Sequence, residues 1–295
     1  AERDREAPSE IERPFPELFA AREQLLRAHL AAACEGSPDR PRMGLVRAAL
    51  NLEYLPLWAA FLGELGFQPV VSGRTTARML REHLGGVPAE VCLPVKTAAA
   101  HARSLLAGGE VRRVFAPALM ECLRRPGDEL AHTCIYAQQL ADLLRVELGE
   151  RIVPAQLPLD DSVPGMVEPS LTLAHALDRP PERVARALRR AVAFHAGFAT
   201  TRAALGQEAL AAPFDRAVVV MGKPYNVHDR YQNLSLARHL ERLGLPAIPW
   251  DVLPLEQVEL GPRWSNVPWH YTRDQLRTMQ LIRRDGRLFP VLVSS

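Results

Sequence analysis

The stretch RMGLVRAALNLEYLPLWAAFLGELGFQPVVS, residues 42–72, decides the fold class of this chain. Residues 42–50 read as a buried strand, residues 55–66 as a helix closed by Gly66, and residues 67–72 as a second strand. A strand, a helix and a second strand in this order predict a βαβ unit. We therefore expect a parallel sheet that is covered by helices.

The alternation of strands and helices continues on the C-terminal side of this unit. Further helices are expected over 75–84, 95–109 and 137–148, and further strands over 111–119 and 151–157. Residues 168–210 carry no strand signal and are expected to be helical. A second α/β unit then begins, with strands within 215–221, 246–251 and 287–295 and helices within 233–244 and 271–285.

This order predicts two Rossmann/flavodoxin-like α/β lobes with parallel sheets, joined by a helical connector and separated by a cleft. The expected segments are an N-terminal arm or linker (1–42), a first lobe (43–165), the connector (166–212) and a second lobe (213–295). The arm is charged and rich in proline around one helical run, residues 19–33.

Composition excludes several classes of protein. The formal charge of +2 on 295 residues is small, and the arginines are scattered, so neither nucleic acid nor a membrane surface is an expected partner. No apolar run approaches the ~20 residues that span a bilayer, and the N-terminal sequence AERDREAPSE does not resemble a signal peptide. A soluble, cytoplasmic protein is expected.

The four cysteines are the main candidates for chemistry. A chain without an export signal is expected to lack disulfides, so Cys92 and Cys134 were considered as metal or cluster ligands, as reactive thiols, or as inert buried residues. Cys92 precedes a helix that Pro94 can start, and Cys134 also stands before a predicted helix. Backbone N–H groups at a helix N-terminus favour the thiolate form. Residue types and spacing leave the three alternatives open.

Other candidate residues have less specific surroundings. We expect Cys34 to close the helix at 19–33 and Cys122 to be structural. Lys96 either adds positive charge near Cys92 or solvates a helix face. The turn GKPYN, residues 222–226, either lines the cleft or lets Asn226 or Asn233 cap the next helix. The pairs Asp160/Asp161, His228/Asp229 and His270/Tyr271 are expected to be solvated loop residues, because they match no known triad or metal-binding pattern.

Several ordered motifs together resemble one family. These motifs are residues 42–72, PAEVCLPVK (88–96), HTCIYAQ (132–138), GKPYNVHDRYQNLSLARHLERLGLPAIPWDVLP (222–254) and HYTRDQLRTMQLIRRDGRLFPVLVSS (270–295). They are similar to the 2-hydroxyglutaryl-CoA dehydratase-like region of acyl-CoA dehydratase activase-related proteins, the CoA-substrate-specific enzyme activase family. The resemblance covers roughly residues 43–295, leaving out much of the helical connector.

The resemblance implies a protein that handles electrons at low potential. In the family, an ATPase activase module drives an electron onto a cysteine-bound iron–sulfur cluster, either 4Fe-4S or double-cubane, and related dehydratases then eliminate water from 2-hydroxyacyl-CoA. Cys92 and Cys134 match two cluster ligands. The implied partners are the ATPase module in cis or in trans, possibly acyl-CoA, and a second copy of the chain.

Two departures from the family pattern qualify these expectations. The family has a third cysteine after the strand that corresponds to residues 288–293, so a third ligand is expected beyond Ser295. Ile135 stands where the family usually has proline. The alternative expectation is a non-catalytic α/β interaction module that has lost its cluster. In either case this chain alone is expected to be inactive.

Overall fold

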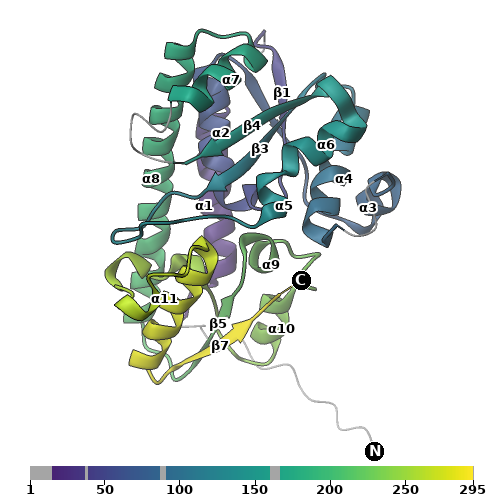
Figure 1. Cartoon of the computed structure of the whole chain (residues 1–295). Helices are drawn as coiled ribbons and strands as arrows, with labels where there is room; N and C mark the ends of the chain where they lie inside the picture. The colour runs from purple at the N-terminus through teal and green to yellow at the C-terminus, as the bar shows by residue number, and fades with distance from the viewer. Residues whose placement is uncertain (1–14, 37–38, 87–90, 160–166, 295) are drawn as a thin grey trace, which may run out of the picture.

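The computed structural model describes residues 15–36, 39–86, 91–159 and 167–294. Its named strands form two parallel sheets, with strand orders β2-β1-β3-β4 and β6-β5-β7 (Figure 1). The strands are β1 (Arg42–Leu45), β2 (Gln68–Val71), β3 (Val114–Glu121), β4 (Ile152–Pro158), β5 (Ala217–Met221), β6 (Ala247–Pro249) and β7 (Leu288–Leu292). Two Rossmann/flavodoxin-like lobes are thereby confirmed.

The helices also follow the predicted order. They are α1 (Leu18–Ala33), α2 (Asn51–Glu64), α3 (Ala77–His83), α4 (Leu93–Ala107), α5 (Ile135–Gln138), α6 (Leu140–Leu148), α7 (Val167–Leu177), α8 (Pro181–Ala211), α9 (Pro224–His228), α10 (Leu236–Arg242) and α11 (His270–Arg284). Short 3₁₀ turns lie at η1 (Gly149–Arg151), η3 (Trp250–Val252), η4 (Leu255–Gln257) and η5 (Pro262–Trp264). The predicted connector corresponds to α7 and α8.

The first βαβ unit differs from its prediction at one boundary. The strand expected over 42–50 ends at Leu45, and α2 begins at Asn51 rather than at residue 55. Ala49 has φ of 52° in the left-handed region, which reverses the chain between the strand and the helix. Apolar residues alone do not reveal such a turn, because a buried strand and a buried helix start have similar compositions.

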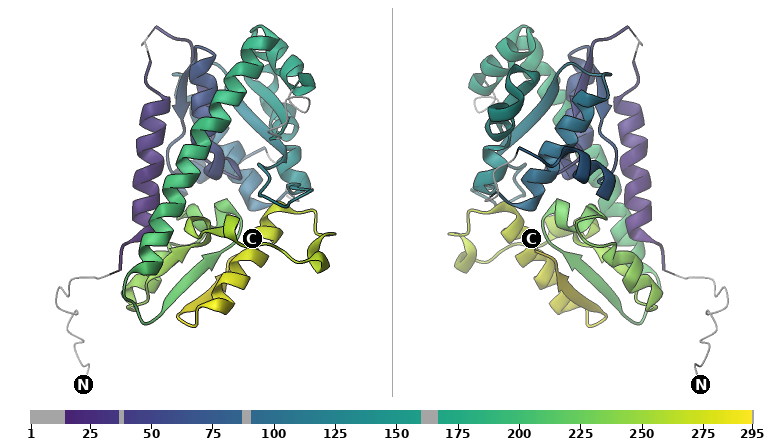
Figure 2. Two further views of the ribbon diagram at one scale, coloured as in Figure 1. Left: turned by 90° about the vertical axis from the view of Figure 1, so that its left-hand side faces the viewer. Right: turned by 90° about the vertical axis from the view of Figure 1, so that its right-hand side faces the viewer.

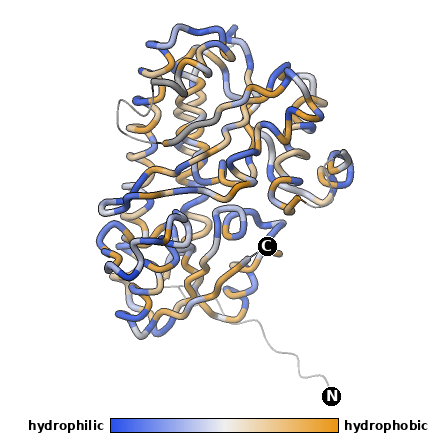
Figure 3. The backbone as a smooth tube through the Cα atoms, in the orientation of Figure 1, coloured by the Kyte–Doolittle hydropathy of each residue, from blue (hydrophilic) through white to orange (hydrophobic). Residues whose placement is uncertain are grey.

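Helix α2 lies at the centre of the core. Its buried residues run from Asn51 to Leu62 with few interruptions, because α1, α8 and the strands β1 and β2 surround it. A helix that is apolar on all sides is typical of a fully enclosed position. Apolar colour likewise runs through the strands of both sheets (Figure 3).

The helices α1 and α8 extend along both lobes (Figure 2). Helix α1 contacts α2, α8 and β6, and α8 contacts α2 and η3, so each touches elements around both sheets. The described part of the predicted N-terminal arm is therefore packed into the fold through Leu18, Arg22 and Leu26. The domain boundaries at residues 42, 165 and 212 stay a prediction.

The carboxyl ends of the two sheets face one another. Thr75, which follows β2, hydrogen-bonds Asp229, which follows β5 and α9. His132, which follows β3, forms a parallel bridge with Trp269 at the start of α11. In α/β sheets, ligands bind beyond the carboxyl ends of the strands, close to where the strand order reverses. The junction between the lobes is therefore the region in which to look for a site.

Candidate functional site

Cys92 and Cys134 occupy the same local position in two different helices. Cys92 is the N-cap of α4 with φ −66° and ψ 155°, and Cys134 is the N-cap of α5 with φ −71° and ψ 153°. Pro94 lies in the first turn of α4. Both thiols are half-buried. The expectation that each cysteine stands at the head of a helix is confirmed.

The two thiols approach one phenol from different segments of the chain. Tyr225, in the first turn of α9, is buried, and burial raises the pKa of its hydroxyl. The charges of ionised Cys134 and Cys92 raise this pKa further. Coulombic repulsion weakens with distance, so both sulfurs lie close to Tyr225. The structure therefore brings the two cysteines from the first lobe to one residue of the second.

The turn after β5 completes this neighbourhood. Lys223 is the N-cap of α9, with φ −69° and ψ 157°, and its Nζ lies 5.9 Å from the centre of the Tyr225 ring. Gly222 has φ of 153°, and a Cβ at this position would lie 2.5 Å from the carbonyl oxygen of Val293. Glycine is therefore required for the close approach of the chain that leaves β7.

The residue that follows β7 is also held at this point. The amide of Val293 donates to the carbonyl of Met221 at 2.8 Å, and its carbonyl accepts from Asn226 Nδ2 at 3.2 Å. Asn226 is thus used to hold β7 and does not cap the next helix. Asn233 accepts from the amide of Ser235, whereas α10 itself begins without a side-chain cap. The capping interpretation of GKPYN is wrong, because tertiary contacts engage both amides.

The other two cysteines have structural surroundings. Cys34 is the C-cap of α1 and is half-buried, as predicted. Cys122 is fully buried, and its Sγ lies 3.7 Å from the hydroxyl of Tyr271. Burial raises the pKa of Cys122, so its thiol stays protonated. Its structural role is confirmed.

The donor chemistry at Cys92 and Cys134 suits an iron–sulfur cluster, but the number of ligands is incomplete. Such clusters require cysteine thiolates, usually four. Within the described residues, no group of three or more histidines, cysteines, aspartates or glutamates is arranged to hold a metal ion. Two thiolates from this chain would therefore make up part of a ligand set. Lys96, which is half-buried in α4, leaves both of its expected roles open.

The interpretation of His228, Asp229, His270 and Tyr271 as solvated loop residues is wrong. The side chain of His228 is 7% exposed, and the other three residues are buried to a similar degree. His228 Nε2 lies 3.0 Å from Asp251, and Tyr271 donates to Glu53 at 2.8 Å. Packing of the second lobe against the first encloses these groups. Asp160 and Asp161 lie outside the described residues.

A directional chain of hydrogen bonds links the lobes near the end of β2. The hydroxyl of Thr75 donates to Asp229 at 2.6 Å, so it accepts from His101 Nε2 at 3.0 Å. Ser72 accepts from the amide of Arg47 at 2.8 Å, so its hydroxyl is free to donate to His101 Nδ1 at 2.8 Å. This pattern requires one protonated and one unprotonated ring nitrogen. His101 is therefore a neutral imidazole.

Replacing His101 by glutamine is expected to reduce the loss of stability on acidification between pH 6.5 and about pH 4. Burial lowers the pKa of His101 from 6.5 to about 4. The unfolded chain therefore binds this proton first, and the stability present above pH 6.5 falls as the pH drops towards 4. The shift corresponds to about 3 kcal/mol at the acid end. Urea unfolding between pH 7 and pH 4 measures the difference in slope.

His239 provides the control for this experiment, because it is exposed on α10. A His239→Gln variant should follow the wild-type pH dependence. An unchanged pH dependence in His101→Gln would show that His101 is protonated in the folded state.

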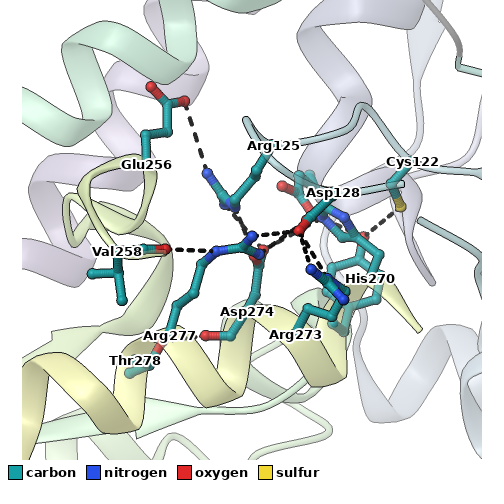
Figure 4. Close-up of polar contacts among 12 residues, drawn as sticks. Cys122, Arg125, Asp128, Glu256, Val258, His270, Arg273, Asp274, Arg277 and Thr278 are labelled. Atoms are coloured by element: carbon teal, nitrogen blue, oxygen red, sulfur yellow. Dashed lines mark hydrogen bonds and ion pairs between the residues drawn. The ribbon is translucent and has the colours of Figure 1, made fainter. Parts of the chain in front are cut away.

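A cluster of charged residues between the lobes escaped prediction. Arg273, Asp274 and Arg277 of α11 are buried and bind Arg125 and Asp128 of the loop after β3 (Figure 4). The only sequence signal was that α11 has no continuous apolar stripe, although it is long enough to need one. Its partners lie about 145 residues earlier, at a separation that periodicity does not address.

A comparison with protein families gives one match. The family described as a CoA enzyme activase uncharacterised domain matches residues 42–253, well over half of the chain, and includes both Cys92 and Cys134. Among curated proteins, none matches the chain. In the part of the chain that the structure describes, no helix has the length and apolar character needed to cross a membrane.

Proposed function

The chain belongs to this CoA enzyme activase family, and from that relationship we propose that it is the cluster-carrying region of an ATP-dependent, low-potential electron-transfer or reductive protein related to 2-hydroxyacyl-CoA dehydratases and their activases. In this proposal Cys92 and Cys134 are two thiolate ligands of an iron–sulfur cluster. The observation that carries it is that two helix N-cap cysteines approach one buried phenol from separate segments.

The surroundings of the thiols support an anionic group. The backbone N–H groups at the heads of α4 and α5 and the ammonium of Lys223 favour thiolate and stabilise the negative charge of a cluster. When bound, the cluster would supply one-electron redox chemistry. The part of this chain would be to hold the sulfurs in place and to limit water around them with buried groups such as Tyr225.

A further ligand is expected from the residues after β7. The hydrogen bonds of Val293 to Met221 and Asn226 place the end of β7 beside the turn that carries Tyr225. A cysteine just beyond Ser295 would therefore emerge near Cys92 and Cys134. The proposed electron donor is an ATPase activase module, with acyl-CoA and a second copy of the chain as further proposed partners.

Replacing Cys92 or Cys134 by serine is expected to abolish stable cluster binding. After anaerobic reconstitution with iron and sulfide, the protein should hold about four irons and absorb in the visible range, and each variant should lose most of both signals. Cys34→Ser is the matched control, because Cys34 is also half-buried at the end of a helix, and it should retain the cluster.

Two results would contradict the proposal. Protein that stays free of iron after reconstitution, with the residues beyond Ser295 included, would leave the alternative of a non-catalytic interaction module. The same conclusion would follow if the Cys92→Ser/Cys134→Ser double variant kept both its iron and its activity with an activase partner.

A further inference from the structure

The chain that follows β3 folds back before it reaches Cys134. We call residues 122–133 the Cys134 loop. At its base, Cys122 N–H donates to Ala131 at 2.9 Å, and Thr133 N–H donates to Met120 at 3.1 Å. The Thr133 hydroxyl also donates to Leu119. The residue before Cys134 is therefore held against the end of β3.

The tip of the Cys134 loop is bound to α11 by buried ion pairs. Asp128 accepts from Arg273 Nε at 2.8 Å and from Arg277 Nη1 at 3.0 Å. Arg125 donates to both oxygens of Asp274, at 2.6 and 3.0 Å. The carboxylates are 0% and 1% exposed, and Figure 4 shows Asp128 between the two arginines of α11.

Backbone contacts join the loop to the same helix on its other side. His132 N–H donates to Pro268 at 2.9 Å, and His270 N–H donates to His132 at 3.0 Å. Pro268 directly precedes α11, and His270 is its first residue. The loop that leads to Cys134 is thus attached to the second lobe by both side chains and backbone.

Cys92 has a different support. It caps α4, which packs against α3, β1 and β3 of the first lobe. A displacement of α11 is therefore transmitted to Cys134 through the loop, whereas the support of Cys92 does not include α11.

We propose that the ion pairs of Asp128 with Arg273 and Arg277, and of Arg125 with Asp274, position Cys134 relative to Cys92. Helix α11 thereby couples the orientation of the second lobe to the spacing of the two thiols. The ion pairs suit this task because bidentate arginine–carboxylate contacts have a fixed geometry, and a buried charge that loses its partner is strongly disfavoured. The role of the thiols as cluster ligands rests on the proposed function, but their relative placement does not.

Alkylation of the two cysteines in the iron-free full chain tests the proposal. Iodoacetamide labelling followed by peptide mass spectrometry reports the rates of Cys134 and Cys92 in the same molecules, so Cys92 is an internal reference. In Asp128→Asn, the ratio of the Cys134 rate to the Cys92 rate should rise about fivefold or more, because the loop opens locally. Asp128→Glu, which keeps the charge, should restore most of the wild-type ratio.

Asp251→Asn is the matched control for general destabilisation. Asp251 is also buried and also binds two arginines, Arg22 and Arg202, but none of these residues belongs to the Cys134 loop. This variant should be destabilised without a change in the ratio. If Asp128→Asn fails to fold, Arg125→Gln is the substitute, because Arg125 lies at the edge of the network with 14% exposure.

An unchanged ratio in a folded loop variant, or the same increase in Asp251→Asn, would overturn the proposal. This outcome is independent of iron. A changed ratio in a protein that binds no cluster would support the positioning role and contradict the proposed function, whereas an unchanged ratio with normal cluster binding would do the reverse.

Discussion

Replacing Gly206 by alanine is expected to lower the free energy of unfolding by about 3 kcal/mol, which is the cost of overpacking a closely packed interior. Gly206 lies within α8 and faces η3 of the second lobe. A Cβ at this position would lie 1.9 Å from the carbonyl oxygen of Val252 and 2.7 Å from its carbonyl carbon. Both are backbone atoms, so neither moves aside by a side-chain rotation, and α8 would have to separate from η3.

Gly197→Ala is the control, because Gly197 lies in the same helix with no atom within 4 Å of an added Cβ. This substitution should stabilise the protein by about 0.5 to 1 kcal/mol, since alanine loses less backbone entropy than glycine in a helix. Urea unfolding of the two variants gives both values. If Gly206→Ala were as stable as Gly197→Ala, α8 would not approach the second lobe as closely as described here.

Replacing Asp251 by asparagine is expected to destabilise the protein by about 3 to 5 kcal/mol, the cost of removing one partner from a buried ion pair. Asp251 Oδ2 lies 2.9 Å from Arg22 Nε, 3.2 Å from Arg202 Nη1 and 3.0 Å from His228 Nε2. These partners belong to α1, α8 and α9, so one carboxylate joins four elements around η3. Asparagine would leave two buried guanidinium groups without a counter-charge.

The pH dependence of this effect has a defined sign. Burial by itself raises the pKa of Asp251, but Arg22, His228 and Arg202 together hold it well below its usual range. A carboxylate with a lowered pKa contributes stability above its ordinary value of 3.8 and loses this contribution as the pH falls through the lowered pKa. The difference between wild type and Asp251→Asn should therefore be full at pH 7 and still present at pH 4.

Asp285→Asn is the control for this prediction. Asp285 pairs with Arg287 near the surface, where both side chains are partly exposed, and its hydrogen bond with Arg287 lowers its pKa. Exposed ion pairs contribute little because water screens them. The unfolding midpoint of Asp285→Asn should stay close to that of wild type, and an equal loss in both variants would contradict the central role of Asp251.

Most of the secondary structure was predictable because each element carries its own local pattern. The strands β3 and β5 are apolar runs bounded by turns, and α8 has both the proline pair at its start and a helical period. The N-cap positions of Cys92 and Cys134 were also predictable, since a helix start depends on neighbouring residues. The family match supports the predicted relationship to activases.

Residue-by-residue burial at the lobe junction was not predictable in the same way. His228 and His270 were predicted to be solvated because polar residues in loops usually are. Their burial depends on which residues of the first lobe cover them, and the carboxylates that bind them, Asp251 and Asp274, appear ordinary in the sequence. The same is true of Asp128, whose partners on α11 lie far along the chain.

The sequence by itself thus determined the order of strands and helices, the two parallel α/β lobes and the helix-head positions of Cys92 and Cys134, because these follow from local periodicity and turn chemistry. Only the tertiary structure decided that both thiols approach Tyr225 and that α11 holds the loop before Cys134. The physical reason is that a buried charge is stable only beside its partner, and this pairing depends on three-dimensional proximity rather than on spacing along the chain.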